Sequence, residues 1–331
     1  MNTILSSLLD PQRPVLLQVT STDLVDATAW VTANTEWIEQ RLCRHGAVLF
    51  RGFDVATAEK LERFATALSS DLPGFAEESS PRHRIQGAVF SSTDHPERYP
   101  IQMHNEYSYA AEWPMKLLFS CIQPALKRGA TPVASTRAIL RRLRPSTRAA
   151  FHERGIMYVR NYRHGVGVGW RKAFGTDSRA EVEQYCARAG VQTEWLAEDG
   201  LRTRQTGAAI VRHPRTGEEV WFNHGFFFNV HSLEPVELRE ALLEEGEDSL
   251  STQTYYGTGE AIPVDVIDEL REAYVHEKVS FTWQRGDVLV IDNMLTSHGR
   301  EPYHGPRKIA VVMSDRFRRC DLQNNLADVA T

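Results

Sequence analysis

Hydrophobic and polar positions follow two different periods along the chain, and the change between them predicts helices interleaved with short strands. Patterns typical of helices occupy residues 34–44, 57–69, 178–190, 235–245 and 263–277. A further helical stretch, 136–153, contains Pro145, which suits the first turn of a second helix and not the interior of one. Ser178 and Glu181 have the spacing of a capping box at the start of their helix.

Short apolar runs bounded by glycine and proline predict buried strands. These runs lie at residues 47–51, 115–121, 288–292 and 307–314, and residues 279–283 alternate between apolar and polar. Strands of this length, decorated by helices, are typical of an α+β protein with a β-sandwich or jelly-roll centre. Nothing marks a boundary, so we expect one domain over residues 1–331, with helical insertions at roughly 136–278.

Composition narrows the class of protein without naming a function. The 331 residues carry a net charge of −5, which argues against nucleic acid as the main partner. The four cysteines are far apart and form no Cys-x-x-Cys pair, as expected for free thiols in a reducing compartment. No signal peptide or membrane-spanning run is evident, so we expect a soluble, cytoplasmic protein without a membrane partner.

The histidines supply the first chemical signal. Two histidines and one carboxylate can hold iron(II) on one side and leave positions open for substrate and oxygen. Two of the twelve histidines have a carboxylate two residues on, in His95-Pro96-Glu97 and in His104-Asn105-Glu106. The first pair has proline at its centre, and the second precedes a predicted strand. Because carboxylates are 43 of 331 residues, the spacing alone leaves both pairs open, with a hydrogen-bonded histidine as the ordinary alternative.

A third ligand candidate follows a buried strand near the C-terminus. His298 comes shortly after the strand 288–292, and Arg307 begins the next predicted strand. Ile309 and Val311 share the face of Arg307, so that arginine would point into the interior. An interior guanidinium needs an anion and suits a carboxylate, either a bound one or that of a structural salt bridge.

These residues carry a family resemblance. The chain resembles the taurine dioxygenase/clavaminate synthase-like family of iron(II)- and 2-oxoglutarate-dependent oxygenases, and is most similar to the branch of the syringomycin-pathway hydroxylase. The matching stretches, in chain order, are residues 45–53, 104–109, 129–132, 221–223, 286–288, 292–294, 298–300 and 305–307.

The resemblance implies a fold, cofactors and site residues. It implies a double-stranded β-helix (jelly-roll) core with surrounding helices, and the cofactors iron(II), 2-oxoglutarate and O2. Carried over by position, His104, Glu106 and His298 are the iron ligands and catalytic residues. Arg307 would pair with the distal carboxylate of 2-oxoglutarate, assisted by the hydroxyl of Thr131. The resemblance favours this His-x-Glu pair over the earlier one.

Two positions depart from the family pattern. Members often have two glycines before the threonine, whereas this chain has Gly129 and Ala130 before Thr131. In taurine-type members a second arginine, four residues beyond the first, holds the anionic group of the substrate. That position is Val311 here, so a sulfonate held in that way is not expected.

The implied reaction is hydroxylation of an unactivated aliphatic carbon, with release of succinate and CO2. The implied substrate is amino-acid-derived and belongs to antibiotic or other natural-product biosynthesis. Glu106 argues against a halogenase, in which a small residue replaces the carboxylate. Desaturation or oxidative cyclisation and a non-catalytic sensor on the same fold remain alternatives. A nucleic-acid demethylase is disfavoured by the net charge.

Residues 164–170 are rich in glycine and lack the lysine of a phosphate-binding loop. They suit either a surface loop or a lid in which Trp170 closes the substrate site. The ring of Tyr107 or Tyr109 is a further candidate for the substrate pocket.

The aromatic segment 221–228 suits the core better than a substrate wall. Within it, Asn223 is the candidate for contact with substrate, because a buried amide must find partners. His224 and His231 have no carboxylate two residues on and are predicted not to be ligands.

Arg137, Arg141, Arg144 and Arg148 recur at the spacing of one helix face, which Pro145 could break. A solvated basic surface is the ordinary interpretation of such a face. The alternative is a docking surface for an acidic carrier protein that presents a tethered amino acid.

Overall fold

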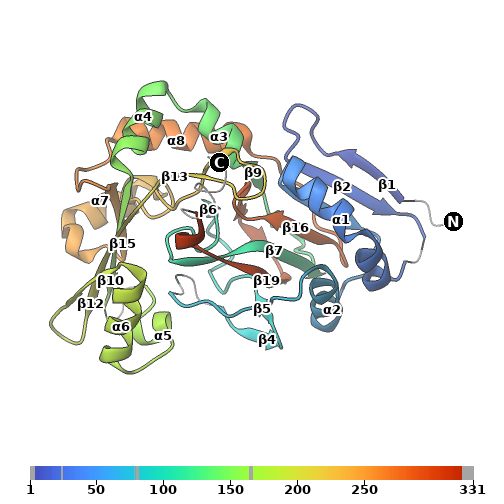
Figure 1. Ribbon diagram of the computed structural model, residues 1–331, viewed down its shortest axis with the longest axis horizontal. Coiled ribbons are helices and arrows are strands. Elements are labelled where there is room, and N and C mark those ends of the chain that lie inside the picture. Colours follow the sequence, from blue (N-terminus) through green and yellow to red (C-terminus); the bar gives the residue numbers. More distant parts are fainter. Residues whose placement is uncertain (1–3, 24, 78, 80–81, 164–166, 323–331) are drawn as a thin grey trace, which may run out of the picture.

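A large β-sheet forms the centre of the protein, a computed structural model of which describes residues 4–23, 25–77, 79, 82–163 and 167–322 (Figure 1). Its strands, in spatial order, are β1 (Ile4–Leu8), β2 (Leu16–Ser21), β3 (Ala47–Arg51), β16 (Val288–Asp292), β7 (Glu112–Gln123), β19 (Lys308–Arg318), β5 (Val89–Ser91) and β4 (Arg84–Gln86). Only β2 and β3 run parallel; every other neighbouring pair is antiparallel.

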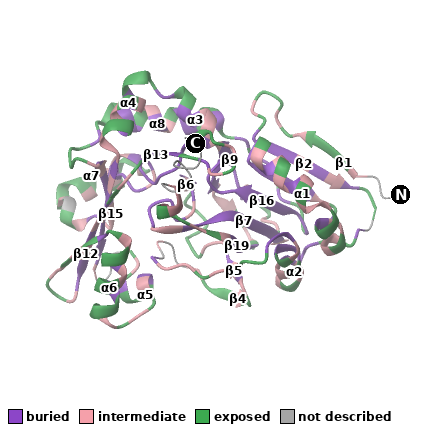
Figure 2. Cartoon of the chain, viewed as in Figure 1, coloured by how far each residue is buried: buried purple, intermediate pink, exposed green. Residues whose placement is uncertain are grey.

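The apolar strands are buried on both faces, which explains why they read as continuous apolar runs. In β3, Val48 and Phe50 pack under α1 (Ala27–His45) and α2 (Ala58–Leu68), whereas Leu49 joins the second core on the opposite face. Successive side chains of a strand point to opposite faces, so one strand serves both layers. Figure 2 shows the same burial along β7, β16 and β19.

A smaller sheet lies on the side of the second core and completes the double-stranded β-helix expected from the sequence. Its strands are β6 (Ile101–His104), β17 (Thr296–Arg300) and β9 (Val133–Ser135). The short turn from β16 to β17 carries the chain directly from the large sheet to the small one. This crossing brings the C-terminal histidine candidate beside β6.

Residues 136–278 form the layer on the left and top of Figure 1. Its helices are α3 (Thr136–Arg142), α4 (Pro145–Arg154), α5 (Trp170–Phe174), α6 (Arg179–Ala189), α7 (Val236–Glu245) and α8 (Val264–Glu277), with 3-10 turns at Val230–Ser232 and Glu247–Ser249. The layer also contains a four-stranded sheet that the helical patterns did not indicate. Its order is β11 (Gln192–Trp195), β12 (Leu201–Gly207), β10 (Ile156–Tyr162) and β15 (Thr252–Tyr256). β13 (Ile210–Arg212) and β14 (Glu219–Trp221) form a hairpin in this layer. Outside it, β8 (Lys127–Arg128) pairs with the distant strand β18 (Tyr303–His304).

Local sequence signals set most helix ends. The side chain of Ser178 accepts a hydrogen bond from the backbone N–H of Glu181, as the capping box predicts, and the helix ends at Gly190 in the left-handed region. Pro145 begins α4, separated from α3 by the extended residue Leu143. The first long helix, α1, starts earlier than predicted because Asp26 caps it.

The prediction of a strand at 279–283 is wrong in one respect. Val279, Phe281 and Trp283 are buried and the residues between them are exposed, as the alternation indicates. The segment forms only an isolated bridge from Val279 to Val133, so the backbone is extended without a ladder. Among the described residues, no helix is long and apolar enough to cross a membrane.

Candidate active site

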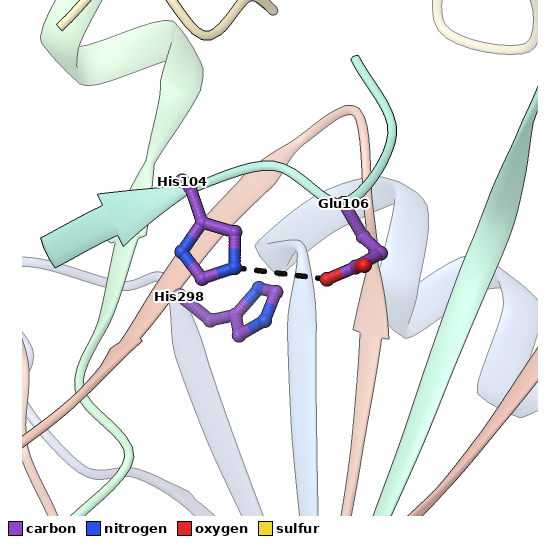
Figure 3. Close-up of side chains that lie close together, drawn as sticks. All are labelled: His104, Glu106 and His298. Carbon is purple, nitrogen blue, oxygen red and sulfur yellow. Dashed lines mark ion pairs between the residues drawn. The ribbon is translucent and has the colours of Figure 1, made fainter. Parts of the chain in front are cut away.

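Two histidines face each other across neighbouring strands of the smaller sheet. His104 is the last residue of β6, and the antiparallel register pairs it directly with His298 in β17. Residues opposite each other on such strands project to one face. Their ring centroids lie 4.4 Å apart (Figure 3). The ring of Phe119, from the large sheet, lies 5.1 Å from that of His298 and closes the site on that side.

Glu106 reaches the same point from the turn after β6 and not from the strand itself. Its Oε2 lies 3.6 Å from Nε2 of His104. The next residue, Tyr107, has a φ of 56°, which turns the chain sharply at this point. The carboxylate of the His-x-Glu pair thus lies just beyond the end of the strand, and the histidine is its last residue.

Asn293 fixes this turn from the other sheet. Its Oδ1 accepts a hydrogen bond of 2.8 Å from the backbone N–H of Glu106, and its Nδ2 donates to the carbonyl of Glu106 at 2.8 Å. Asn105 in turn donates to the backbone carbonyl of Asn293 at 2.6 Å. Sequence reasoning noted residues 292–294 as a matching stretch but assigned Asn293 no role. The signal was a polar pair directly after an apolar strand.

The three side chains fit a metal ion. One ligand atom from each of His104, Glu106 and His298 lies within 4.8 Å of the others, and they are the group of this kind among the described residues. Nδ1–H of His104 donates to the carbonyl of Gln102 at 2.9 Å, which leaves the lone pair of Nε2 for a metal. Nδ1 of His298 is buried with no hydrogen-bond partner among the described residues. Two imidazoles and one carboxylate suit non-haem iron(II).

The electrostatics of the cluster also suit a cation. Burial, together with the neighbouring His104, lowers the pKa of His298 to about 3, so the ring is neutral. Burial alone would raise the pKa of Glu106, but the Arg82 guanidinium and the two histidines outweigh it and hold that pKa well below its usual range. Neutral imidazole and ionised carboxylate are the forms that bind metal.

Arg307 and Thr131 form a second group in the same cavity. Nε of Arg307 donates to the carbonyl of Gly129 at 3.0 Å, and Nη2 donates to Oγ1 of Thr131 at 3.3 Å. Nε1–H of Trp283 also donates to that hydroxyl oxygen, at 3.0 Å. With two donors already on its oxygen, Thr131 has its own O–H left for an acceptor in the cavity.

Arg307 has no ion pair with a carboxylate among the described residues. Burial, with Arg300 nearby, lowers the pKa of Arg307 to about 10, which reports an environment without a compensating anion. A guanidinium in this state favours a bound carboxylate. Val311, four residues on, also lines the cavity and places an apolar side chain there.

One cavity of about 500 Å³ joins the two groups. Its wall is mostly apolar, as is usual for small-molecule sites. The apolar part of the lining comprises Pro100, Ile101, Leu117, Phe119, Phe227, Phe228, Leu233, Leu238 and Val311. The polar part that belongs to neither group includes Ser79, Arg82, Gln102, His224, Glu234, Ser251 and Thr252.

The residues predicted to contact substrate do not line this cavity. The side-chain amide of Asn223 makes its hydrogen bonds within the protein. It donates to the carbonyl of Ala209 at 2.7 Å and accepts from the N–H of Gly225 at 2.7 Å. Tyr107 is 3% exposed and packs in the core, as does Tyr109.

Trp170 lies in a separate cluster with α6, and its Nε1–H donates to the carbonyl of Asp199 at 3.0 Å. Of the predicted lid loop, residues 164–166 lie outside the described residues, and 167–170 are described. The fold therefore does not place Trp170 as a plug at the substrate site.

The aromatic segment 221–228 divides between the core and the cavity wall. Trp221 and Phe222 are fully buried, whereas His224, Phe227 and Phe228 line the cavity. Among the described residues, His224 is not part of the metal cluster, and its Nδ1 lies 2.6 Å from Oγ of Ser108. Its wall position could not be read from the sequence, because the chain turns irregularly here and no periodic pattern assigns the faces.

The row of four arginines, expected as a solvated basic surface or alternatively as a carrier-docking surface, is divided between α3 and α4, and two of its members form ion pairs. Arg137 on α3 pairs with Glu218 at 2.7 Å. Arg144, just before α4, pairs with Asp265 and Glu269 of α8, both at 2.9 Å. These ion pairs attach the helices to their neighbours, so a continuous basic stripe is absent from this described part of the surface.

Most of the chain is similar in sequence to known proteins. Residues 11–313 match the model of the family described as taurine catabolism dioxygenase TauD, TfdA family. The chain is 38% identical over 279 residues to the dapdiamide synthesis protein DdaC of Enterobacter agglomerans, covering 84% of each chain. It is 28% identical over 293 residues to a clavaminate synthase-like protein of Arabidopsis thaliana, covering 85% of each.

Solved structures share the fold at low sequence identity. PvcB of Pseudomonas aeruginosa superposes with a TM-score of 0.57 at 16% identity, over 95% of this chain and 94% of that one. AAD-2, solved with Mn(II) and N-oxalylglycine, gives a TM-score of 0.56 at 15% identity, over 94% and 97%. At these identities the likeness establishes the double-stranded β-helix and nothing finer.

Proposed function

The chain belongs to the TauD/TfdA family of dioxygenases, and from this membership we propose that it hydroxylates an aliphatic carbon of an amino-acid-derived substrate in natural-product biosynthesis. The family makes it a non-haem iron(II)- and 2-oxoglutarate-dependent dioxygenase. The role of the relative DdaC in dapdiamide synthesis supports the choice of pathway class. The observation that carries the proposal is the cluster of His104, Glu106 and His298 in one cavity with Arg307.

In this proposal His104, Glu106 and His298 hold iron(II), and Arg307 and Thr131 bind the distal carboxylate of 2-oxoglutarate. Bound together, iron(II) and 2-oxoglutarate supply the oxidation of an unactivated C–H bond by O2, with release of succinate and CO2. The protein contributes position and the exclusion of water. Phe119 and Val311 supply apolar wall in the same cavity, which strengthens the electrostatic contacts made inside it.

The cofactor assignment is tested by anaerobic titration of the metal-free protein with iron(II) and 2-oxoglutarate. A chelated 2-oxo acid on iron(II) gives a weak visible charge-transfer band. We expect the band with the native protein, its loss in His298→Ala and its weakening at fixed 2-oxoglutarate in Arg307→Ala. The absence of a band at saturating cofactors in the native protein would contradict the assignment and favour a sensor.

The substrate class is tested with a panel of amino acids, each offered free and loaded on a carrier protein. A mass gain of one oxygen that requires iron(II), 2-oxoglutarate and O2 supports hydroxylation. A loss of two hydrogens instead identifies desaturation or ring closure. Turnover of the loaded form alone would establish a tethered substrate, and Arg141→Glu should impair it if docking uses the exposed part of the α3 surface.

A further inference from the structure

Arg82 lies in the same cavity as the metal cluster, although no sequence motif pointed to it. Its side chain is 7% exposed, and Nη2 lies 2.6 Å from Oε1 of Glu106. The other carboxylate oxygen, Oε2, is the one 3.6 Å from Nε2 of His104. The two oxygens of Glu106 are therefore divided between an arginine and the metal cluster.

The guanidinium is itself held from two further sides. Nη1 of Arg82 lies 3.7 Å from the sulfur of Met313 in β19. Cζ of Arg82 lies 5.8 Å from the ring centre of Tyr107, the residue that follows Glu106 in the turn. Because Arg82 is packed in this way, its guanidinium cannot follow the carboxylate of Glu106 if that carboxylate rotates. The ion pair therefore fixes the rotamer of Glu106.

Glu77, five residues before Arg82, is anchored to the helical layer. Oε1 of Glu77 accepts from the hydroxyl of Tyr185 in α6 at 2.9 Å, and Oε2 pairs with Arg160 in β10 at 3.5 Å. The carbonyl of Glu77 accepts from the hydroxyl of Tyr109 at 2.6 Å. Glu77 is 2% exposed, so this anchor is part of the protein interior.

We propose that Arg82 is a positioning residue that restricts Glu106 to one metal-ligating oxygen. A carboxylate can bind a metal through one oxygen or two, and the second oxygen would take a coordination position that 2-oxoglutarate or O2 needs. By holding Oε1, Arg82 keeps that position open. The inference rests on the proposed function, because it assumes that Glu106 is a metal ligand.

The test compares Arg82→Gln with native protein, using Mn(II) alone and then iron(II) with 2-oxoglutarate. In Arg82→Gln, Oε1 of Glu106 loses its ion pair and can also bind the metal. We expect Mn(II) affinity to stay within about tenfold of native, whereas 2-oxoglutarate affinity, read from the charge-transfer band, falls by at least about tenfold. Arg82→Lys keeps the positive charge with one compact donor group and should recover part of the loss.

Arg84→Gln is the matched control. Arg84 lies two residues further on and is exposed; it donates to the carbonyl of Gly87 at 2.8 Å and stacks on the ring of Phe90, so both affinities should be native. Because breaking a buried ion pair can unfold a protein, thermal melting accompanies each variant. Arg82→Gln/Glu106→Gln removes both charges and should melt closer to native than Arg82→Gln.

Three outcomes are distinguishable. Native 2-oxoglutarate affinity in folded Arg82→Gln, or an equal loss of Mn(II) and 2-oxoglutarate binding, would overturn the positioning role while the proposed function stands. Loss of 2-oxoglutarate affinity with metal retained supports it. Absence of the band in the native protein would instead remove the proposed function, on which the inference depends.

Discussion

Two segments of the chain carry the same His-x-Glu pattern, and the protein uses them differently. His95 and Glu97 lie in an exposed loop, of which His95 lines the cavity, and His104 and Glu106 lie in the cavity wall. The loop that carries His95 is held by a residue of β17. Arg300 donates to the carbonyls of His95, Pro96 and Tyr99 at 2.6–2.7 Å. Those bonds fix the backbone, and among the described residues neither His95 nor Glu97 belongs to a group that could hold a metal ion.

The second segment is completed by residues from elsewhere in the chain. His298 is paired opposite His104 by strand register, and Asn293 fixes the turn of Glu106. Arg82 supplies the counter-charge that makes a buried carboxylate tolerable. A His-x-Glu pair thus becomes a candidate metal site only where a neighbouring strand adds a third ligand and another segment neutralises the acid.

The largest expected effect separates the two histidines. His104→Ala should weaken Mn(II) binding by more than about 100-fold, because it removes a ligand and not merely its support. His95→Ala should bind Mn(II) like the native protein. Calorimetric titration of both metal-free variants checks this, and a comparable loss in His95→Ala would show that the wrong pair was assigned.

Asn293 holds the backbone of the Glu106 turn and Arg300 that of the His95 loop, and replacing them should affect metal affinity differently. Asn293→Ala releases both backbone groups of Glu106, so Mn(II) affinity should fall by about 10–100-fold and the free energy of unfolding by about 3 kcal/mol. Arg300→Gln should lower the free energy of unfolding but leave Mn(II) affinity unchanged.

Urea unfolding and metal titration of both variants provide the measurement. If Arg300→Gln weakened Mn(II) binding as much as Asn293→Ala, the two loops would be coupled and the contrast between them would fail.

Acidification should lower the stability of the protein more through His298 than through His95. The pKa of His298 is lowered to about 3, so on acidification the unfolded chain takes up its proton and the folded chain does not. Stability is therefore lost as the pH falls through the ordinary histidine range. Between pH 7.5 and 5.5 this costs about 1.4 kcal/mol, which His298→Gln should remove.

Burial and Arg300 also lower the pKa of His95, but its exposure makes the effect smaller. His95→Gln should therefore change the acid sensitivity less than His298→Gln does. The check is the difference in unfolding free energy between the two pH values, measured on metal-free protein. Equal changes in the two variants would argue against the buried position of His298.

The smallest effect is expected when the two sequences are made alike. Pro96→Asn converts the first segment to His-Asn-Glu, identical to residues 104–106. We expect one bound Mn(II) per chain, as in the native protein, and little change in stability, since residue 96 is exposed. A second equivalent of Mn(II) in the titration would mean that the tripeptide alone suffices.

Much of the fold could be predicted because its signals are local. Proline, glycine and the Ser178 cap set helix ends, and the apolar runs at 47–51 and 288–292 became β3 and β16 with the same bounds. The four-stranded sheet of the helical layer was missed because its strands mix charged and apolar residues, as in β12 and β10. Residues 279–283 show that alternation reports burial and not strand pairing.

The sequence by itself determined the class of chemistry: the family motifs identify an iron(II)- and 2-oxoglutarate-dependent oxygenase and nominate His104, Glu106, His298 and Arg307. Tertiary structure alone decided which contacts support them. Arg82 and Asn293 act on Glu106 across separations that no periodic pattern encodes. It also moved the predicted substrate contacts away from the cavity, placing Phe227 and His224 in its wall instead. The physical reason is that motifs are local, whereas a cavity is formed by side chains that meet only after the sheets have packed.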